Sequence, residues 1–206
     1  WIDDRHPDYW SVPYLPIDPK DIGREYESDV IRINSQSGKG GIGYVLEENF
    51  GFHIPGKMRE DVGYTVKDVS DKQHRELVPK DILDVFKTVY VNISSPIALK
   101  ECHFIQKDGG IEAEISLEKS GVDKLYHGRG NGRLDAVSNA LQRHSDLDYS
   151  IVSYQEHALT VGSNSKACSY VAIQKPNGTV VWGAGIHEDI ITASVLALIS
   201  AVNRIQ

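Results

Sequence analysis

Two glycine-rich stretches stand directly before segments with helical periodicity, and their residue types suggest anion binding. The first is HGRGNGRLDAVSNAL at 127–141, and the second is WGAGIHEDIITASVL at 182–196. A helix N-terminus offers backbone N–H groups without intrahelical partners, and glycine lets an anion approach them closely. A carboxylate fits such a place, while Asp135, Glu188 and Asp189 would face an ammonium group. These residues suggest an amino-acid site, although a pair of tight turns that bind nothing is the simpler interpretation.

The same glycines do not fit a nucleotide. A dinucleotide-binding turn needs a third glycine at the position that Arg133 occupies. The stretch GKGG at 38–41 also fails as a phosphate-binding loop, because Ile33 stands where its first glycine belongs and Gly40 replaces the Ser/Thr.

Composition limits the class of partner. The chain has 206 residues and a formal net charge of −7, and no block of Lys and Arg stands out, which disfavours nucleic acid and anionic membranes. Its longest apolar stretch, 193–202, is shorter than the roughly 20 residues that a membrane span needs. Cys102 and Cys168 lack CxxC spacing, which argues against structural zinc or a disulfide framework. We therefore expect a cytoplasmic protein with no nucleic-acid or membrane partner.

The glycine-rich stretches belong to an internal repeat. At a constant offset of 55 residues, Gly128 matches Gly183, and the residues that follow also correspond. Upstream, AEISLEKSG at 113–121 resembles YVAIQKPNG at 170–178 if small changes in turn length are allowed. Each copy contains strands, a glycine-rich turn and a helix, so we predict an α+β fold of two units about a pseudo-twofold axis.

The periodicity of apolar residues in two segments indicates how each segment is buried. IEAEISLE at 111–118 alternates strictly between apolar and polar residues, which is typical of a half-solvated antiparallel strand. The last helix, expected over 188–205, is apolar on nearly every side. Such a helix must be buried on more than one side, and we expect a subunit interface to cover the second side.

The first 90 residues have a different character. Residues 1–36 form an expected extended linker, with four of the eight prolines and several aromatic residues, and a short strand is expected at 30–34. Residues 37–90 form an expected small helical subdomain, because their apolar residues recur at three- and four-residue spacing. The repeated region, 91–206, is then the remaining domain.

Four stretches resemble one enzyme family, the long form of 2-isopropylmalate synthase. They are VPYLPIDPKDIGREYESDVIRINSQSGKGGIGYVL at 12–46, GRGNGRLDAVSNAL at 128–141, YQEHAL at 154–159 and WGAGIHEDIITASVLALISAVNR at 182–204. The resemblance implies condensation of acetyl-CoA with 2-oxoisovalerate, the first committed step of leucine synthesis. The family's catalytic TIM barrel carries a divalent metal (zinc, magnesium or manganese), and neither barrel nor HxH-type metal motif occurs here. We expect a piece of a longer protein, inactive alone and without a cofactor.

The resemblance also implies the role of the repeated region. In the family this part is a homodimeric regulatory domain of two βββα units that binds L-leucine as feedback inhibitor. The positions matching the family's leucine contacts are Asn131, Gly132, Leu134, Asp135, Ile151, Tyr154, Ala158, Ser165, Ala167 and Ile186. Arg133 and Ser165 depart from the family pattern of proline and a small apolar residue. Tyr26 matches a linker tyrosine that assists at a catalytic site, with a buried aromatic anchor as its other interpretation.

Other interpretations stay open at this point. Citramalate synthase has a similar domain that senses isoleucine, although NSQSGKGG at 34–41 favours the leucine enzyme. A stand-alone amino-acid-sensing module, or a dimerisation domain with degenerate ligand sites, would also carry such a repeat. His157 would either contact the ligand or form hydrogen bonds near a domain interface.

Overall fold

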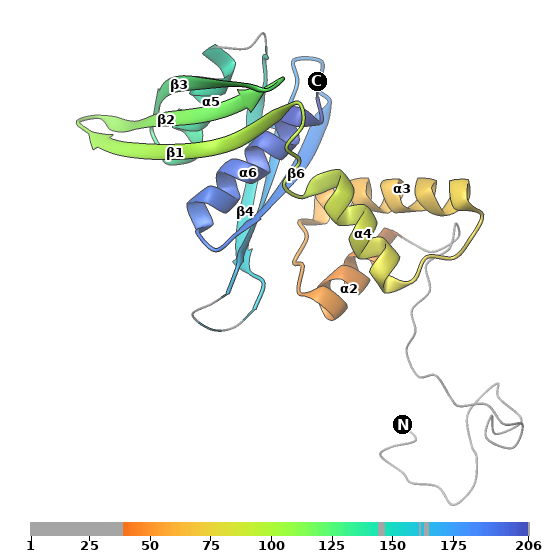
Figure 1. The fold of residues 1–206 in the computed structure, drawn as a ribbon. Coiled ribbons are helices and arrows are strands. Elements are labelled where there is room, and N and C mark those ends of the chain that lie inside the picture. Colours follow the sequence, from red (N-terminus) through yellow and green to blue (C-terminus); the bar gives the residue numbers. More distant parts are fainter. Residues whose placement is uncertain (1–38, 144–146, 161, 163–164, 206) are drawn as a thin grey trace, which may run out of the picture. The chain divides into compact units, whose positions relative to one another are not determined.

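A computed structural model describes residues 39–143, 147–160, 162 and 165–205 of the chain (Figure 1). The expected linker at 1–36, the expected strand at 30–34 and Tyr26 lie outside the described residues. None of the helices described is long and apolar enough to cross a membrane.

Three helices form the first described part of the chain: α2 (Lys39–Phe50), α3 (Gly56–Gln73) and α4 (Pro79–Tyr90). Gly51 ends α2 with a φ of +72°, a left-handed conformation that glycine adopts at little cost. Pro79 begins α4, where its fixed φ suits the first helical turn, and the Asp81 carboxylate accepts the Val78 N–H. We call these three helices the helical unit.

Two three-stranded antiparallel meanders follow, each with one helix behind it. The first unit consists of β1 (Ile97–Lys107), β2 (Gly110–Lys119), β3 (Val122–Gly130) and α5 (Arg133–Arg143). The second consists of β4 (Ser150–Ala158), β5 (Ala167–Gln174), β6 (Val180–His187) and α6 (Ile190–Asn203). The predicted α+β fold of two βββα units is therefore confirmed.

The strand registers show how the two units correspond. Each first strand carries a bulge at the same place, between Leu99 and Glu101 in β1 and between Ile151 and Ser153 in β4. These bulges lie opposite Leu117 of β2 and Ile173 of β5, respectively. Because a bulge fixes the register of its strand pair, a bulge shared by both units supports duplication of one unit.

The predicted offset of 55 residues is wrong for the glycine turns. β3 ends at Gly130 and β6 at His187, while α5 begins at Arg133 and α6 at Ile190, an offset of 57 in both cases. Gly128 therefore corresponds to Gly185. The sequence match failed because both units contain a G-x-G pattern, and matching one pattern to the other shifted the comparison by two residues.

Close contact between strand and helix explains why these two glycines occupy equivalent places. A Cβ on Gly128 would lie 2.1 Å from the Ala136 carbonyl oxygen, and a Cβ on Gly185 would lie 2.0 Å from that of Ala193. The glycines thus let each helix rest directly on the backbone of its strand.

The β2–β5 correspondence needs a second correction. The sequence match placed Ala113 with Tyr170, but the register places it with Ser169, since Ala113 lies opposite Gly128 and Ser169 opposite Gly185. A one-residue slip in a strand moves every side chain to the other face. The first hairpin closes at Lys119 and Val122 around two residues, whereas the second closes at Lys175 and Thr179 around three, and this extra residue produced the error.

Helices α5 and α6 lie between the two sheets (Figure 1). Val195, Leu198 and Ile199 of α6 are buried in one apolar core together with Ile115 of β2 and Val137 of α5. The expectation that a subunit interface covers the second side of α6 is therefore wrong, because the first unit of the same chain covers it.

The helical unit packs on the opposite face of the second sheet. Phe86 and Tyr90 of α4 share an apolar core with Tyr170 of β5 and with Trp182 and Ala184 of β6. The second sheet is thus covered on one face by α6 and on the other by the helical unit.

Candidate functional site

A pocket of about 490 Å³ opens where the first turns of α5 and α6 converge. Both glycine-rich turns lead into it, as an amino-acid site built from the repeat requires. Its lining residues are Ile111, Gly132, Arg133, Leu134, Asp135, Tyr154, Glu156, Ile190, Ile191, Ser194 and Val195. The volume lies within the range of pockets for small molecules, roughly 300–1,000 Å³.

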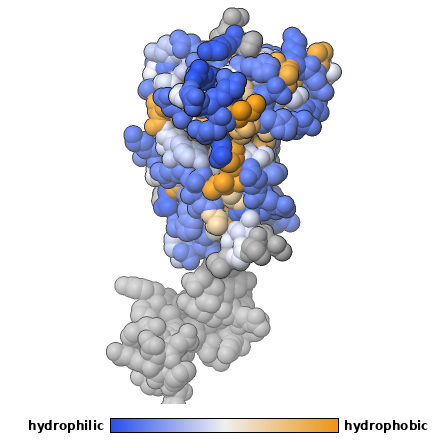
Figure 2. Space-filling view, turned by 90° about the vertical axis from the view of Figure 1, so that its left-hand side faces the viewer, coloured by the Kyte–Doolittle hydropathy of each residue, from blue (hydrophilic) through white to orange (hydrophobic). Residues whose placement is uncertain are grey.

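Apolar side chains form much of this pocket. Leu134 of α5 and Ile191 of α6 occupy corresponding positions in the two units, 57 residues apart, and both line the pocket. Ile111 and Val195 add further aliphatic surface. Figure 2 shows that hydrophobic side chains gather in a band, bordered by hydrophilic residues, on the side of the molecule where the β1–β2 hairpin ends.

One wall of the pocket is polar. The Tyr154 hydroxyl donates to the Glu156 carboxylate, and it lies 2.8 Å from the Ser194 hydroxyl, which lies 3.1 Å from that of Ser169. Burial raises the pKa of Tyr154, and the Glu156 carboxylate contributes in the same direction. Tyr154 therefore stays a neutral hydrogen-bonding group, and Glu156 supplies a negative charge at the pocket.

A positive charge lies at the same pocket. Arg133 is the first residue of α5, and its guanidinium carbon lies 5.9 Å from the centroid of the Phe104 ring, within the range of a cation–π contact. Arg133 and Glu156 give the pocket both charges that a zwitterion needs.

The two acids nearest the helix starts act as caps. The Asp135 carboxylate accepts the Asn131 N–H at 2.8 Å, and the Asp189 carboxylate accepts the Thr192 N–H at 2.7 Å. The Thr192 hydroxyl also donates to Asp189, and these two hydrogen bonds lower the pKa of Asp189. Both acids thus stabilise their own turns, so Glu156 is the acid better placed to meet an ammonium group.

The structure divides the ten positions matched to leucine contacts. Four line this pocket: Gly132, Leu134, Asp135 and Tyr154. Asn131 precedes them in the same turn, and Ile151 lies on β4 with its side chain packed against the core that contains α6.

The other four positions lie farther along the second sheet. Ala158 pairs with Ala167 where β4 ends and β5 begins, and the Ser165 hydroxyl in the connecting turn accepts the Thr160 N–H at 3.1 Å. Ile186 packs against the core of the helical unit, on the face of the sheet opposite α6. The leucine-contact role of all ten positions stays a prediction.

Several pocket residues were not predicted, and the sequence held a signal for some of them. Glu156 lies two residues after Tyr154 on the same strand, so both side chains must point to the same face. Ile190 and Ile191 could be recognised as pocket residues only with the correct offset of 57, which matches them to Arg133 and Leu134.

His157 belongs to the contact between the second sheet and the helical unit. Its Nε2 accepts the His53 N–H at 3.3 Å and lies 3.0 Å from the Tyr170 hydroxyl, and its Nδ1 lies 3.1 Å from the Ala158 carbonyl oxygen. These contacts favour the interface role that was one of its two interpretations.

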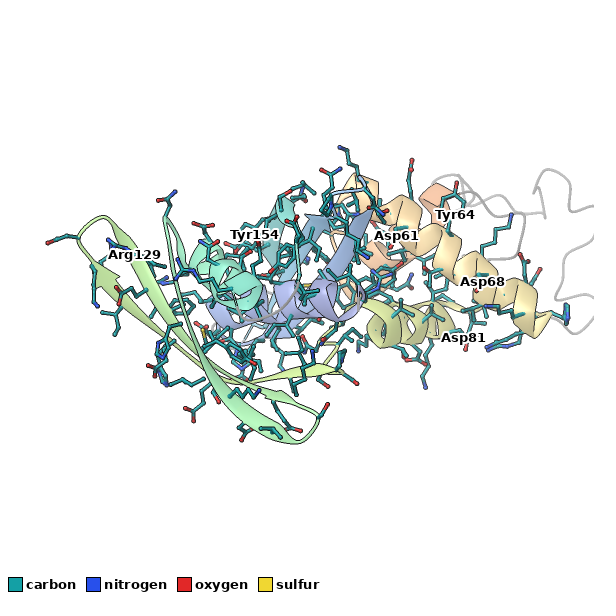
Figure 3. The ribbon with its side chains drawn as sticks, turned by 90° about the horizontal axis from the view of Figure 1, so that it is seen from above. Asp61, Tyr64, Asp68, Asp81, Arg129 and Tyr154 are labelled. Atoms are coloured by element: carbon teal, nitrogen blue, oxygen red, sulfur yellow. The ribbon has the colours of Figure 1, made fainter. Side chains whose placement is uncertain are left out.

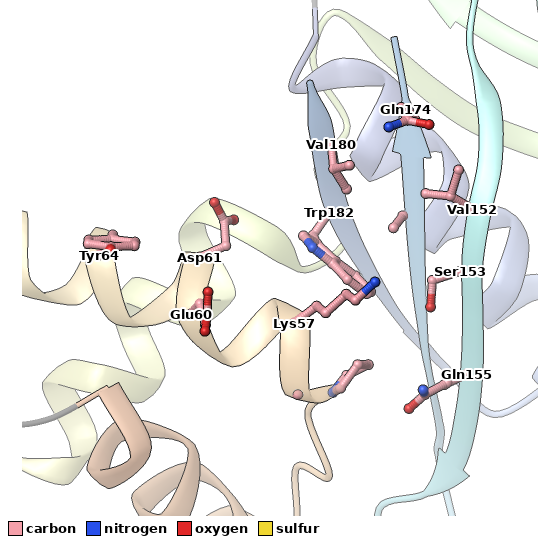
Figure 4. Close-up of a pocket in the computed structure, with 13 residues that line it drawn as sticks. Lys57, Glu60, Asp61, Tyr64, Val152, Ser153, Gln155, Gln174, Val180 and Trp182 are labelled. Carbon is pink, nitrogen blue, oxygen red and sulfur yellow. The ribbon is translucent and has the colours of Figure 1, made fainter. Parts of the chain in front are cut away.

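A second, larger hollow of about 1,120 Å³ lies between α3 and the second sheet (Figure 4). Lys57, Glu60 and Asp61 of α3 line it, with Lys57 extending toward the sheet, and Gln155 and Trp182 line it from the sheet side. Within the described part of the chain, no three His, Cys, Asp or Glu residues come together as a metal site.

Comparison with known proteins gives several relatives that are named 2-isopropylmalate synthase. The chain is 54% identical over 203 residues to the 2-isopropylmalate synthase of Desulfitobacterium hafniense, 48% over 204 residues to that of Helicobacter hepaticus, and 41% over 200 residues to that of Corynebacterium efficiens. These alignments cover 98%, 95% and 95% of this chain, but only 36%, 36% and 34% of the relatives. The chain therefore spans about a third of their length.

Two family models match different parts of the chain. Residues 2–47 match the model described as "Alpha-isopropylmalate synthase, post-catalytic domain-like". Residues 76–206, which comprise more than half of the chain and include both βββα units, match the model described as "LeuA allosteric (dimerisation) domain". The chain belongs to the LeuA allosteric (dimerisation) domain family.

Proposed function

We propose that this chain is the regulatory part of a 2-isopropylmalate synthase and binds L-leucine as feedback inhibitor. The observation that carries this proposal is the convergence of two corresponding helix starts on one pocket that holds aliphatic side chains and both signs of charge. The whole enzyme would condense acetyl-CoA with 2-oxoisovalerate in a catalytic barrel encoded upstream. A divalent metal would belong to that barrel, and we expect the present chain alone to be inactive.

Leucine fits the chemistry of the pocket in three ways. Its carboxylate would meet Arg133 and the first N–H groups of α5, where the helix dipole favours negative charge. Its ammonium group would meet Glu156 and the Tyr154 hydroxyl. Its isobutyl group would lie among Leu134, Ile191 and the neighbouring aliphatic side chains.

The open side of the pocket supports a homodimer. Tyr154 and Ile190 line the pocket, yet they remain 44% and 42% exposed. Apolar and aromatic residues left open beside a ligand site are typical of a surface that a partner covers. A second copy of the chain is the partner that we propose, and sedimentation equilibrium of the purified chain measures the association directly.

Isothermal titration of the 206-residue chain tests the ligand. We expect saturable binding of L-leucine, and weaker binding of L-valine and L-isoleucine because their branching is placed differently against the aliphatic wall. Tighter binding of isoleucine would support the alternative of a citramalate synthase domain. Binding of none of the three amino acids would contradict the proposal and leave a dimerisation module with degenerate sites.

A further inference from the structure

Helix α6 joins the pocket to the helical unit. Its first turns contribute Ile190, Ile191 and Ser194 to the pocket, and its C-terminal cap, Arg204, contacts the helical unit. In Figure 3, α6 extends between Tyr154, on the pocket wall, and Asp61, on α3. One helix therefore contacts both places that a regulatory signal would have to connect.

Arg204 makes three contacts at this end of α6. Its guanidinium carbon lies 4.1 Å from the centroid of the Tyr90 ring, and its Nη2 lies 3.6 Å from the Asp61 carboxylate. Its Nη1 donates to the Trp182 carbonyl oxygen of β6. The side chain is only 21% exposed, so water weakens these contacts less than it would at an open surface.

Tyr90 carries the contact into the helical unit. Its ring is fully buried at the end of α4, and its hydroxyl donates to the Asp61 carboxylate of α3 at 2.7 Å. The same hydroxyl lies 2.7 Å from the hydroxyl of Thr65, one turn farther along α3. Arg204 thus contacts α4 through the ring and α3 through the carboxylate that the ring's hydroxyl also binds.

The chain between the helical unit and β1 is fastened to the same end of α6. Asn203 binds the Ile97 N–H at 3.0 Å and the Ile93 carbonyl oxygen at 2.7 Å, and the Ser200 hydroxyl accepts the Ile93 N–H at 2.9 Å. Asn92 forms hydrogen bonds with both the N–H and the carbonyl oxygen of Ile186 in β6. Ser200 and Asn203 are buried, and together with Asn92 they hold the connection in one geometry.

We propose that α6 transmits the occupancy of the pocket to the helical unit, with Arg204 as the positioning residue that couples α6 to Asp61 and Tyr90. Because every residue of α6 from Ala193 to Asn203 except Leu196 is buried, a displacement of its first turn is not absorbed along the helix and reaches its last turn. The inference rests on the proposed function for the identity of the occupant, leucine.

Hydrogen exchange of the 206-residue chain with and without L-leucine tests this coupling. In the wild-type chain we expect leucine to change the exchange of peptides from α3 and α4, which do not line the pocket. In Arg204→Gln we expect leucine still to bind by isothermal titration, while exchange in α3 and α4 no longer responds. An unchanged response in Arg204→Gln, or wild-type binding with no response in α3 and α4, would overturn the coupling.

Two further variants control for loss of structure. Lys175→Gln removes a basic side chain near the same end of α6, where its Nζ lies 3.5 Å from the Ile205 carbonyl oxygen. Lys175 is not part of the contact of Arg204 with Asp61 and Tyr90, so the response of this variant to leucine should equal that of the wild type. Tyr90→Phe keeps the buried ring and removes only the hydroxyl, so it should reduce the response of α3 more than that of α4. A loss of the response in Lys175→Gln would instead show that any disturbance near this end of α6 suffices, and would contradict the role of Arg204.

An arm without ligand separates this inference from the proposed function. Ile191→Trp places a large side chain in the pocket. As a single substitution it should alter hydrogen exchange in α3 and α4, but combined with Arg204→Gln it should leave that exchange unaltered. If the wild type fails to bind leucine, the proposed function falls, while this arm still decides the coupling. No difference between Ile191→Trp and the wild type in α3 and α4 would overturn it.

Discussion

The two βββα units have the same topology, but their central strands have different surroundings. In β2, Ala113, Ile115 and Leu117 are buried while their neighbours are only partly buried, so one face meets the core and the other meets solvent. In β5, every residue from Cys168 to Ile173 is buried. The first unit is a one-sided sheet, whereas the second is covered on both faces.

This difference gives the two duplicated units different roles in the molecule. The outer face of the first sheet carries charged pairs such as Lys107 with Glu112, as expected of a surface in water. The outer face of the second sheet carries Tyr170, which contacts the helical unit. Both units build the pocket, and among the described residues it is the sheet of the second unit that packs against the helical unit.

The largest expected effects are losses of stability, and the first of them tests how much the molecule depends on α6. Gly185→Val would drive a branched side chain into the Ala193 carbonyl oxygen, and since α6 belongs to the core between both units, we expect a loss of about 3 kcal/mol or more. Gly128→Val creates the same overlap against α5 and should cost less, because α5 has a half-exposed face. Urea unfolding followed by circular dichroism measures both.

A matched control for these variants is Gly56→Ala. A Cβ at Gly56 meets nothing within 4 Å, so its unfolding midpoint should equal or exceed that of the wild type. Equal losses in Gly185→Val and Gly128→Val would contradict the view that α6 is the more central helix.

A second pair of substitutions compares the outer faces directly. Tyr170 of β5 and Glu114 of β2 occupy corresponding positions in the register. Tyr170→Ala empties a fully buried site and should cost about 3–5 kcal/mol of unfolding free energy. Glu114→Ala removes a side chain that is 44% exposed and should change the unfolding free energy by no more than about 0.5 kcal/mol. Similar losses at both positions would show that the first sheet is also covered on its outer face in solution.

The sequence predicted the units well because their signals are local. Strict alternation at 111–118 depends only on neighbouring residues. What covers each face depends on distant contacts, so the cover of α6 was wrongly assigned to another subunit. The segment CSYVAI at 168–173 lacks strict alternation and has one polar residue, Ser169, which is typical of a strand buried on both faces.

The site was harder to predict than the fold for the same physical reason. Its glycine turns were found because a helix start has a local pattern. Glu156 and Ile191 were missed because they reach the pocket from another strand and another helix, and the offset of 55 hid that correspondence. A register error of one or two residues is small in sequence but changes which side chains face each other.

A third prediction uses the asymmetry of the pocket. Glu156 corresponds in the register to Phe104 of the first unit, so this acid occurs on only one side of the pseudo-twofold axis. If Glu156 binds the ammonium group, Glu156→Gln should weaken leucine binding about tenfold, since a hydrogen bond to a charged group contributes roughly 1.5–3 kcal/mol. Isothermal titration should also give one leucine per chain at this pocket.

The control for that titration is Glu112→Gln, an acid on the outer face of β2 that does not line this pocket. Its leucine affinity should equal that of the wild type. Equal weakening in both variants would indicate a general effect of net charge and would remove Glu156 from the binding site.

The smallest expected effect concerns the pH dependence of the contact that His157 of β4 makes with the helical unit. Burial lowers the pKa of His157, the hydrogen bond to the Ala158 carbonyl oxygen opposes this, and His53 and Glu47 make smaller contributions that lower and raise it, respectively. The neutral ring accepts hydrogen bonds at Nε2 from the His53 N–H and the Tyr170 hydroxyl, and its Nδ1–H donates to the Ala158 carbonyl oxygen. Protonation at Nε2 would remove the acceptor that joins β4 to the helical unit.

The sign of the pH dependence follows from this lowered pKa. An unfolded histidine takes up a proton near pH 6.5, whereas folded His157 does so only at lower pH, so the unfolded state binds more protons in between. The stability that His157 contributes is therefore complete above about pH 6.5 and is lost as the pH falls through the folded pKa. His157→Gln should lower the urea midpoint more at pH 7.5 than at pH 5, while His103→Gln, on the exposed surface of β1, should not. An equal loss at both pH values would mean that the ring acts by packing alone, and the helical unit would then depend on the Arg204 end of α6 for its polar connection to the second unit.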